Sequence, residues 1–274
     1  MSIDANLRRL FSLEGKIIMM TGAAGGIGGS LSKGMAGIGA IMCNCDISEK
    51  GLKTLEDEIA AEGGKSKSFV MDVTNMDSIK SVVESIVKEY GTIDVLINVA
   101  GINKREGFMD VKEDTYDRIM DINLKSVFFI TQTVVPHMMK KKNGSIINIG
   151  SHNATAMLGG CSVYGASKSG VLGLTRAMAV EWAEWGIRAN AVSPGHVLTP
   201  LTQVTWDHPT RGDYLRDRIA MRRPGYPDEM VGIVALLASD SSSYISGANF
   251  VVDGGCLCGG APWEFDSEYR NKEF

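Results

Sequence analysis

The sequence predicts an α/β fold, in which one doubly wound parallel sheet of about seven strands carries helices on both faces. Short, nearly continuous apolar runs alternate with helical patterns along the whole 274-residue chain, which is the pattern of repeated βαβ units. No stretch rich in Pro, Gly or Ser divides the chain, and no internal repeat is found. We therefore expect residues 1–274 to form a single domain.

The predicted elements follow one another in chain order. The first strand is the apolar run at 16–21, whose lack of alternation is typical of a strand buried on both faces. Further strands are expected at 40–45, 67–71, 94–98, 145–149, 188–192 and 250–252. Helices are expected at 27–37, 48–62, 76–90, 115–141, 164–185 and 228–238. Ser48 is a candidate N-cap, Gly91 closes its helix, and Pro136 should mark a bend or an end.

Two segments depart from this alternation. Residues 199–223 are long and polar and contain two prolines, a composition that predicts a substrate lid or binding loop. The tail at 256–274 is irregular and carries four aromatic residues among many charges. Because such aromatic side chains are poorly accommodated in water, we expect the tail to pack on its own or a neighbouring subunit.

Composition excludes several classes of function. The net charge of −4 has both signs interspersed, so no basic patch indicates nucleic acid, and no apolar run approaches the length needed to span a membrane. The N-terminus lacks the organisation of a signal peptide, which favours a cytoplasmic protein. Five cysteines include two Cys-x-Cys pairs, too tight for the usual zinc spacing, so free thiols and no metal site are expected.

A glycine cluster lies between the first predicted strand and the first predicted helix. Glycines at this turn allow a sharp bend and let a pyrophosphate approach the positive end of the helix. The alternative is a simple tight turn, but the position at the first βα turn favours phosphate binding. The expected contacts are Gly22, Gly25, Gly26, Ile27 and Gly28.

Asp46 ends the second apolar run, about 20 residues after the glycines. A carboxylate at this point can accept both ribose hydroxyls of an adenosine and would repel a 2′-phosphate. The loop positions Ala24 and Gly25, where a phosphate-pairing cation is common, are not basic. NAD is therefore expected rather than NADP, with Asp46 and Ile47 as contacts. The alternative is a helix-capping or turn aspartate.

Tyr164 and Lys168 are four residues apart in a predicted helix, so they share one face. A phenol normally keeps its proton to about pH 10, and a nearby positive charge lowers that pKa. The pair could therefore exchange a proton with an alcohol or a carbonyl. Taken alone, the spacing also fits an aromatic residue at the edge of the core beside a solvated lysine.

Over residues 11–255 the chain resembles the short-chain dehydrogenase/reductase family, whose members have a single NAD(P)-binding Rossmann domain. The resemblance combines the Gly-x-x-x-Gly-x-Gly loop with Asn98-Val99-Ala100-Gly101, Asn123, Ser151 thirteen residues before Tyr164, and Pro194-Gly195. The family usually has Asn-Asn-Ala-Gly where this chain has Asn98-Val99, a change expected to alter packing near the first helix.

The resemblance implies a role for each matching residue. Tyr164 would exchange a proton with the substrate oxygen, and Lys168 would lower the Tyr164 pKa and bind the nicotinamide ribose. Ser151 would bind the same substrate oxygen, and Asn123 would hold a water that relays protons. The remaining cofactor contacts would be Asp72, Val73, Asn98, Ala100, Gly101, Pro194, Gly195, Val197 and Thr199.

Polar side chains near these positions suggest the class of substrate. Donors and guanidinium groups suit a polyol or a carboxylate better than a steroid or a fatty acyl chain. The candidate contacts, besides Ser151 and Tyr164, are His152, Asn153, His196 and Arg105. Two further stretches, 101–106 and 123–129, look like those of the gluconate 5-dehydrogenase and 2-keto-3-deoxygluconate 5-dehydrogenase branch.

We therefore expect an NAD(H)-dependent oxidoreductase that interconverts a secondary alcohol and a ketone on a sugar acid or polyol. One alternative is a more hydrophobic alcohol or ketone, of hydroxysteroid or 3-oxoacyl type. Another is a cofactor-binding regulatory protein without catalysis. The family resemblance also implies a homotetramer or homodimer.

Overall fold

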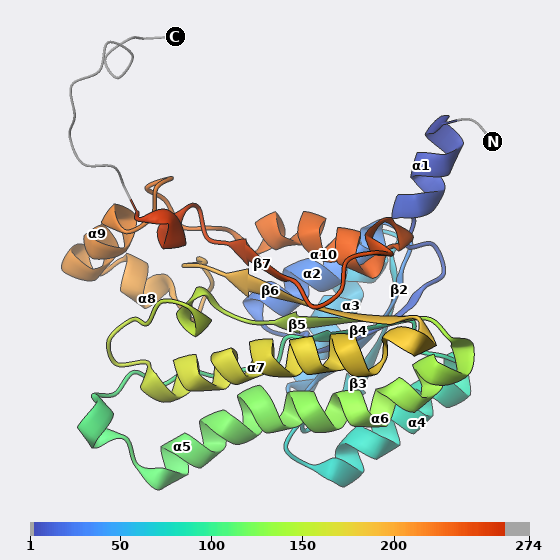
Figure 1. Cartoon of the computed structure of the whole chain (residues 1–274), viewed down its shortest axis with the longest axis horizontal. Coiled ribbons are helices and arrows are strands. Elements are labelled where there is room, and N and C mark those ends of the chain that lie inside the picture. The colour runs from blue at the N-terminus through green and yellow to red at the C-terminus, as the bar shows by residue number, and fades with distance from the viewer. Residues whose placement is uncertain (1–2, 261–274) are drawn as a thin grey trace.

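The computed structural model describes residues 3–260, and its seven strands form one parallel sheet in the order β3-β2-β1-β4-β5-β6-β7 (Figure 1). The chain starts in the middle of the sheet at β1, moves outward to β3, and then crosses back to β4. The order thus reverses between β1 and β4, where doubly wound sheets bind their ligands. The strands are β1 Ile17–Thr21, β2 Ile41–Asp46, β3 Lys65–Val70, β4 Val95–Asn98, β5 Gly144–Ile149, β6 Ile187–Pro194 and β7 Asn249–Val252.

Burial along the strands follows from their place in the sheet. Every residue of β1, β4 and β5 is buried, as their continuous apolar runs predict. The edge strands β3 and β7 instead consist of exposed and partly buried positions, which alternate regularly in β7. Lysines at 65 and 67 keep the β3 edge polar, a common protection against pairing with another chain.

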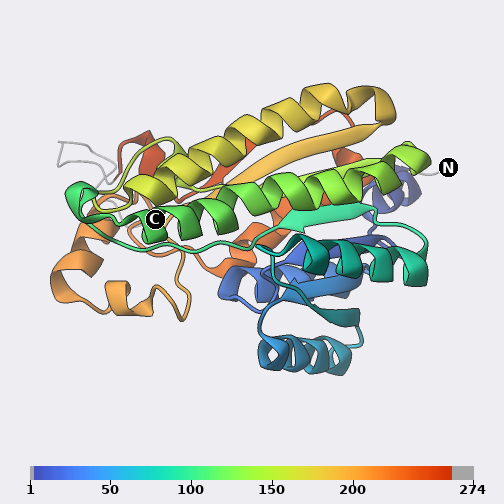
Figure 2. The same cartoon turned by 90° about the horizontal axis from the view of Figure 1, so that it is seen from below.

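Helices cover both faces of the sheet, as Figures 1 and 2 show. One face packs against α2 Gly26–Gly37, α3 Glu49–Ala61 and α10 Val231–Ala238 in one apolar cluster. The other packs against α4 Met76–Tyr90, α6 Ser126–Lys141 and α7 Ser162–Glu181 in a second cluster. The sequence-based expectation of a doubly wound α/β sheet is confirmed.

Local signals placed several helix ends correctly. The Ser48 side chain accepts a hydrogen bond from the Gly51 N–H at the start of α3, so it is the predicted N-cap. Gly91 ends α4 in the left-handed conformation at φ 81°, which glycine adopts without steric strain. Val99 packs against the cluster that contains α2, where its substitution for the family's asparagine was expected to act.

The prediction of a single long helix at 115–141 is wrong in detail. The structure has α5 Glu113–Met120, a π-helical turn at Asp121–Lys125, and then α6. Such turns insert one extra residue and often mark functional positions. Pro136 does not end α6, because it lies on the exposed face, where the carbonyl it leaves free can bind water.

Residues 199–223, predicted to form a lid and therefore named the lid, are also more ordered than their composition indicated. The lid contains α8 Gln203–Trp206 and α9 Pro209–Asp217, and Trp206, Leu215 and Ile219 form a small apolar cluster of their own. These apolar residues are too sparse along the sequence to show a helical period, so their clustering appears only in the folded chain.

The structure also has a helix before the first strand that the sequence-based assignment missed, α1 Ile3–Phe11, which projects from the body of the protein in Figure 1. Among residues 3–260, no helix has both the length and the apolar character needed to cross a bilayer. All five cysteines are free, as expected. The prediction that the tail packs on a subunit concerns mainly residues 261–274, which lie outside the described part of the chain.

Candidate active site

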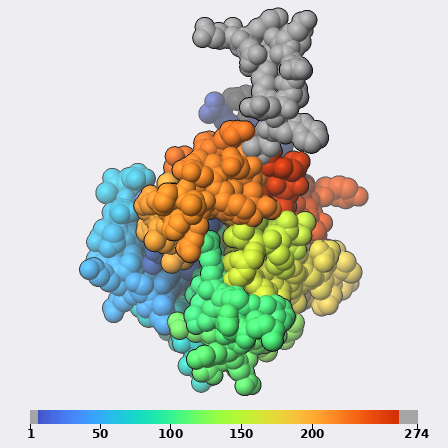
Figure 3. Space-filling view, turned by 90° about the vertical axis from the view of Figure 1, so that its left-hand side faces the viewer, coloured from blue at the N-terminus to red at the C-terminus, as the bar shows by residue number. Residues whose placement is uncertain are grey.

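The candidate residues gather at the carboxyl ends of the strands, on the left in Figure 1 and toward the viewer in Figure 3. In Figure 3 the lid (orange) meets the loop after β4 (green) and the segment after β5 (yellow-green) on this face. The parallel arrangement explains the clustering, because loops that follow neighbouring parallel strands leave the sheet at one edge.

The glycine loop makes close approaches that side chains would prevent. A Cβ on Gly22 would lie 2.7 Å from the Ala100 backbone, and Gly22 has φ +67°. A Cβ on Gly28 would lie 2.2 Å from the Gly22 carbonyl oxygen. Gly22 therefore needs glycine for both its conformation and its space, and Gly28 needs it for space.

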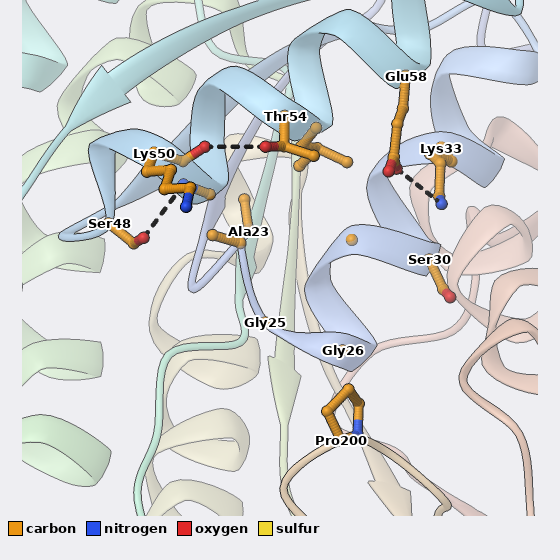
Figure 4. Close-up of a pocket in the computed structure, with 14 residues that line it drawn as sticks. Ala23, Gly25, Gly26, Ser30, Lys33, Ser48, Lys50, Thr54, Glu58 and Pro200 are labelled. Atoms are coloured by element: carbon orange, nitrogen blue, oxygen red, sulfur yellow. Dashed lines mark hydrogen bonds and ion pairs between the residues drawn. The ribbon is translucent and has the colours of Figure 1, made fainter.

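The start of α2 fits a phosphate group. Gly25 is the N-cap, no side chain caps the helix, and its first turn holds no acidic residue. The N–H groups of the first turn thus remain available for an anion at the positive end of the helix. Beside them lies a pocket of about 470 Å³, shown in Figure 4, with Pro200 of the lid below Gly26.

Asp46 connects this loop to the end of β2. Its two carboxylate oxygens accept hydrogen bonds from the Ala24 N–H at 3.1 Å and the Ser48 N–H at 2.9 Å. The bond from Ser48 is one that a turn aspartate makes, so Asp46 does have this alternative role. The bond from Ala24 also places its carboxylate against the glycine loop. Ile47, next to it, is 70% exposed.

Asp72 and Val73 follow β3 at the same edge of the sheet. Asp72 Oδ1 accepts hydrogen bonds from the backbone and hydroxyl of Thr74, and its N–H donates to Ser78. Val73 packs against the second apolar cluster. Both residues lie one strand beyond Asp46, the arrangement expected of an adenine site.

A buried polar network, which the sequence-based assignment did not recognise, lies beneath the loop after β4. Asn98 Nδ2 donates to Asn148 Oδ1 at 2.9 Å, and Asn148 Nδ2 donates to Thr175 Oγ1 at 2.9 Å. Thr21 Oγ1 accepts the N–H groups of Val99 and Ala100. The signal was present in the sequence, since Asn98 and Asn148 interrupt two apolar strands that pair at that position.

Ser151, Tyr164 and Lys168 come together as predicted. Ser151 follows β5, its Oγ accepts the Asn153 N–H at 3.1 Å, and its hydroxyl bonds to the Tyr164 phenol. Lys168, one turn after Tyr164 on α7, is 4% exposed, and its Nζ lies 5.9 Å from the centroid of the Tyr164 ring. The alternative of a solvated lysine is therefore wrong.

The pKa of Tyr164 is raised in this structure, so the lowering by Lys168 that the family resemblance implies stays a prediction. Burial raises the pKa of the Tyr164 phenol, and the hydrogen bond from Ser151 opposes that shift. The Lys168 ammonium instead donates to the Ile149 carbonyl at 2.7 Å. Burial lowers the pKa of Lys168 to about 8, because removal from water disfavours the charged form.

Asn123 lies fully buried in the π-helical turn. Its amide oxygen accepts the Ile102 N–H at 2.8 Å, and its amide nitrogen donates to the Ile102 carbonyl and to Ser167 Oγ. A Cβ on Gly101 would lie 3.3 Å from Asn123 Oδ1 and 3.5 Å from Lys168 Nζ. Asn123 thus fixes the loop after β4 against Lys168.

The end of β6 forms the opposite wall. Pro194 ends the strand, and a Cβ on Gly195 would lie 2.6 Å from Asp253 Cβ. Val197 is buried, and the backbone N–H of Thr199 donates to Thr202 Oγ1 where the lid begins. A Cβ on Gly26 would lie 3.1 Å from Thr199, so the lid begins directly against the glycine loop.

The candidate substrate contacts lie between Ser151 and the lid. The rings of His152 and His196 meet edge to face at 4.4 Å between centroids, and His196 meets Trp206 of the lid at 6.4 Å. Arg105 Nη1 donates to Thr205 Oγ1 of the lid at 3.4 Å. Asn153 and His152 are both only 6% exposed.

The sequence of this chain matches a known protein family. The family model described as Enoyl-(Acyl carrier protein) reductase matches residues 22–256. The chain belongs to the short-chain dehydrogenase/reductase family. It is therefore an oxidoreductase of a family that acts on CH–OH groups with NAD or NADP.

The chain is similar to short-chain dehydrogenases/reductases of more than one activity. The 3-oxoacyl-[acyl-carrier-protein] reductase of Thermotoga maritima is 42% identical over 89% of this chain and 99% of the relative. The 2-dehydro-3-deoxy-D-gluconate 5-dehydrogenase of Escherichia coli is 39% identical over 90% and 97%. A gluconate 5-dehydrogenase from Burkholderia cenocepacia, in complex with NADP and tartrate, has a TM-score of 0.88 and 32% identity over 92% and 99%. The expected resemblance to the gluconate branch is confirmed.

Proposed function

We propose that this enzyme interconverts a secondary alcohol and a ketone on a sugar acid or polyol. The observation that carries the proposal is the contact of Ser151 with Tyr164 at the edge of the sheet, beside a glycine loop that can bind a dinucleotide phosphate. A bound nicotinamide dinucleotide would supply the hydride donor or acceptor.

The side chains of the chain itself handle the proton. In reduction, the Tyr164 O–H would donate to the carbonyl oxygen, and in oxidation the phenolate would accept the proton of the alcohol. The Ser151 hydroxyl would donate to the same oxygen, because its own oxygen is already positioned by the Asn153 N–H. We further propose that Lys168 supplies positive charge beside the phenol and that Asn123 positions Lys168.

The polar character of the pocket supports a sugar acid or polyol. His152, Asn153 and His196 stand where a steroid or fatty acyl chain would need an apolar wall. The related gluconate and threitol dehydrogenases favour the same class. A second candidate, reduction of a 3-oxoacyl thioester, is favoured by the 42% identity to the Thermotoga maritima reductase.

Substrate profiling distinguishes these two candidates. The purified enzyme is mixed with either nicotinamide cofactor and with sugar acids, their matched polyols, or 3-oxoacyl thioesters, and the absorbance of the reduced nicotinamide is followed. We expect turnover of sugar acids or polyols. Turnover of 3-oxoacyl thioesters alone would contradict the proposal and favour the second candidate.

We also propose NAD as the preferred cofactor, although two similar structures contain NADP. Asp46 holds its carboxylate against the Ala24 N–H, where a 2′-phosphate would meet a like charge. Asp46→Asn should therefore raise the NADP-to-NAD ratio of kcat/KM by about tenfold or more, equivalent to roughly 1.4 kcal/mol. Glu84→Gln, exposed in the middle of helix α4, is the control, and an unchanged ratio in Asp46→Asn would contradict this role.

The predicted homotetramer or homodimer stays a prediction, as does the single-domain organisation with a lid at 199–223.

A further inference from the structure

A second pocket, of about 280 Å³, opens beside the residues that follow Ser151. Its wall combines His152 and Asn153 after β5, His196 after β6, and Arg218 at the end of the lid helix α9. Segments far apart in the sequence thus meet here, and their polar side chains share the wall with the apolar Ala156, Met157, Leu158 and Leu257. Through His152 and Asn153, the pocket adjoins the turn that begins at Ser151.

Two buried polar side chains in this wall have unused hydrogen-bonding atoms. His152 Nδ1 and Asn153 Oδ1 lack a partner of good geometry among the described residues, although each side chain is only 6% exposed. The Asn153 side chain is close enough to raise the pKa of His152, but burial has the larger effect and lowers it. Buried polar atoms without partners are uncommon in folded proteins, so this wall suits a ligand that carries hydroxyl groups.

The carboxylates around the pocket are already engaged. Asp253 accepts the Gly255 N–H at 2.9 Å and the Leu257 N–H at 2.8 Å through its two oxygens. The Asp217 carboxylate is 74% exposed and lies 3.7 Å from Arg222. Asp253 thus uses both oxygens on backbone amides, and the exposed Asp217 pairs with Arg222 and not with Arg218.

Arg218 carries a positive charge, and few of its N–H groups donate a hydrogen bond to the described residues. Its guanidinium lies over the Tyr214 ring at 5.4 Å and donates one hydrogen bond, at 3.2 Å, to the Tyr214 hydroxyl. Within residues 3–260 it makes no ion pair, so most of its five N–H groups are available. Burial is the main cause that lowers the pKa of His196 to about 3, while His152, Arg105 and Arg218 lower it further and Asp253 opposes them.

We propose that Arg218 binds the carboxylate of the substrate and makes the enzyme prefer a sugar acid to the neutral polyol of the same length. The inference rests on the proposed function and specifies how the substrate lies. The reacting carbon is at Ser151 and Tyr164, the hydroxyl-bearing chain passes His152 and Asn153, and the carboxylate reaches the lid. A planar guanidinium held against Tyr214 suits a carboxylate because it can donate two parallel hydrogen bonds.

The test compares Arg218→Gln with the wild-type enzyme on gluconate and on its neutral alditol. The gluconate-to-alditol ratio of kcat/KM should fall roughly 10- to 100-fold, the loss expected for a charge-assisted hydrogen-bonded pair, mainly through KM. Arg218→Lys should lose less, because it keeps the charge but not the planar fork. Arg216→Gln, on the same helix and paired with Asp213 at 3.3 Å, should leave the ratio unchanged.

The role of Arg218 in substrate binding can also be measured without turnover. Calorimetry with gluconate and oxidised cofactor on Tyr164→Phe enzyme should show a Kd that rises by a similar factor when Arg218→Gln is added. An unchanged ratio and an unchanged Kd would overturn the role of Arg218, as would a wild-type preference for the alditol. If the wild-type enzyme accepts neither compound and reduces 3-oxoacyl thioesters, the proposed function fails instead.

Discussion

Tyr164→Phe is expected to lower kcat by about 10²- to 10⁴-fold, the usual contribution of a positioned acid–base group. The ring still fits its site, because only the hydroxyl that bonds to Ser151 is removed. Cofactor affinity, measured by calorimetry, should change little, since the glycine loop and Asp46 are unaltered. The measurement is steady-state kinetics in both directions with the best substrate from profiling.

Tyr244→Phe is the matched control, because Tyr244 is fully exposed and far along the chain from the site. A Tyr164→Phe enzyme with wild-type kcat would show that another group transfers the proton.

Since burial raises the pKa of Tyr164, the phenol keeps its proton through neutral pH in the protein without cofactor. Oxidation, which needs the phenolate, should therefore rise with pH, whereas reduction should not.

Lys168→Met should abolish activity and yet stabilise the folded protein at neutral pH. Lys168 is 4% exposed, and its pKa is lowered by burial to about 8, from 10.5. Below about pH 8 both the folded and the unfolded chain hold the proton, so the folded state bears the full penalty of about 3 kcal/mol. Methionine has a similar shape and avoids that penalty, but it leaves the Ile149 carbonyl without its donor. The net gain should be about 1–2 kcal/mol.

The stability gained by Lys168→Met should depend on pH. Between pH 8 and 10.5 the unfolded chain binds the proton that folded Lys168 has released, so the wild-type free energy of unfolding rises with pH in that window. The advantage of Lys168→Met should thus shrink from about pH 8 upward. Denaturant unfolding of both proteins across this range measures it, with the exposed Lys80→Met as control. A destabilised Lys168→Met at neutral pH would show that the bond to Ile149 outweighs the burial of the charge.

Much of the fold was readable in the sequence because its signals are local. Continuous apolar runs define central strands, Gly91 and Ser48 mark helix ends, and glycines at 22 and 28 are required by backbone contacts only 2 to 3 Å away. The same locality placed Ser151, Tyr164 and Lys168 together. Each lies at a defined point on a strand end or a helix face, and parallel topology brings those points to one edge.

Three features could not be read from the sequence. The π-helical turn at Asn123 depends on hydrogen bonds to Ile102 and Ser167, both distant along the chain. The lid helices depend on a small apolar cluster whose members show no period. The raised pKa of Tyr164 and the lowered pKa of Lys168 are the third feature, because loss of hydration is a property of the packed interior.

The sequence by itself determined the doubly wound sheet and the glycine loop, and it predicted the proton-handling residues, since these follow from short-range patterns and spacing. Only the tertiary structure decided how charge is distributed around them. It buried Lys168 against a carbonyl, engaged Asp253 with backbone amides, and left Arg218 without an ion pair among the described residues. The physical reason is that desolvation and Coulomb interactions depend on distances between segments that the order of residues does not state.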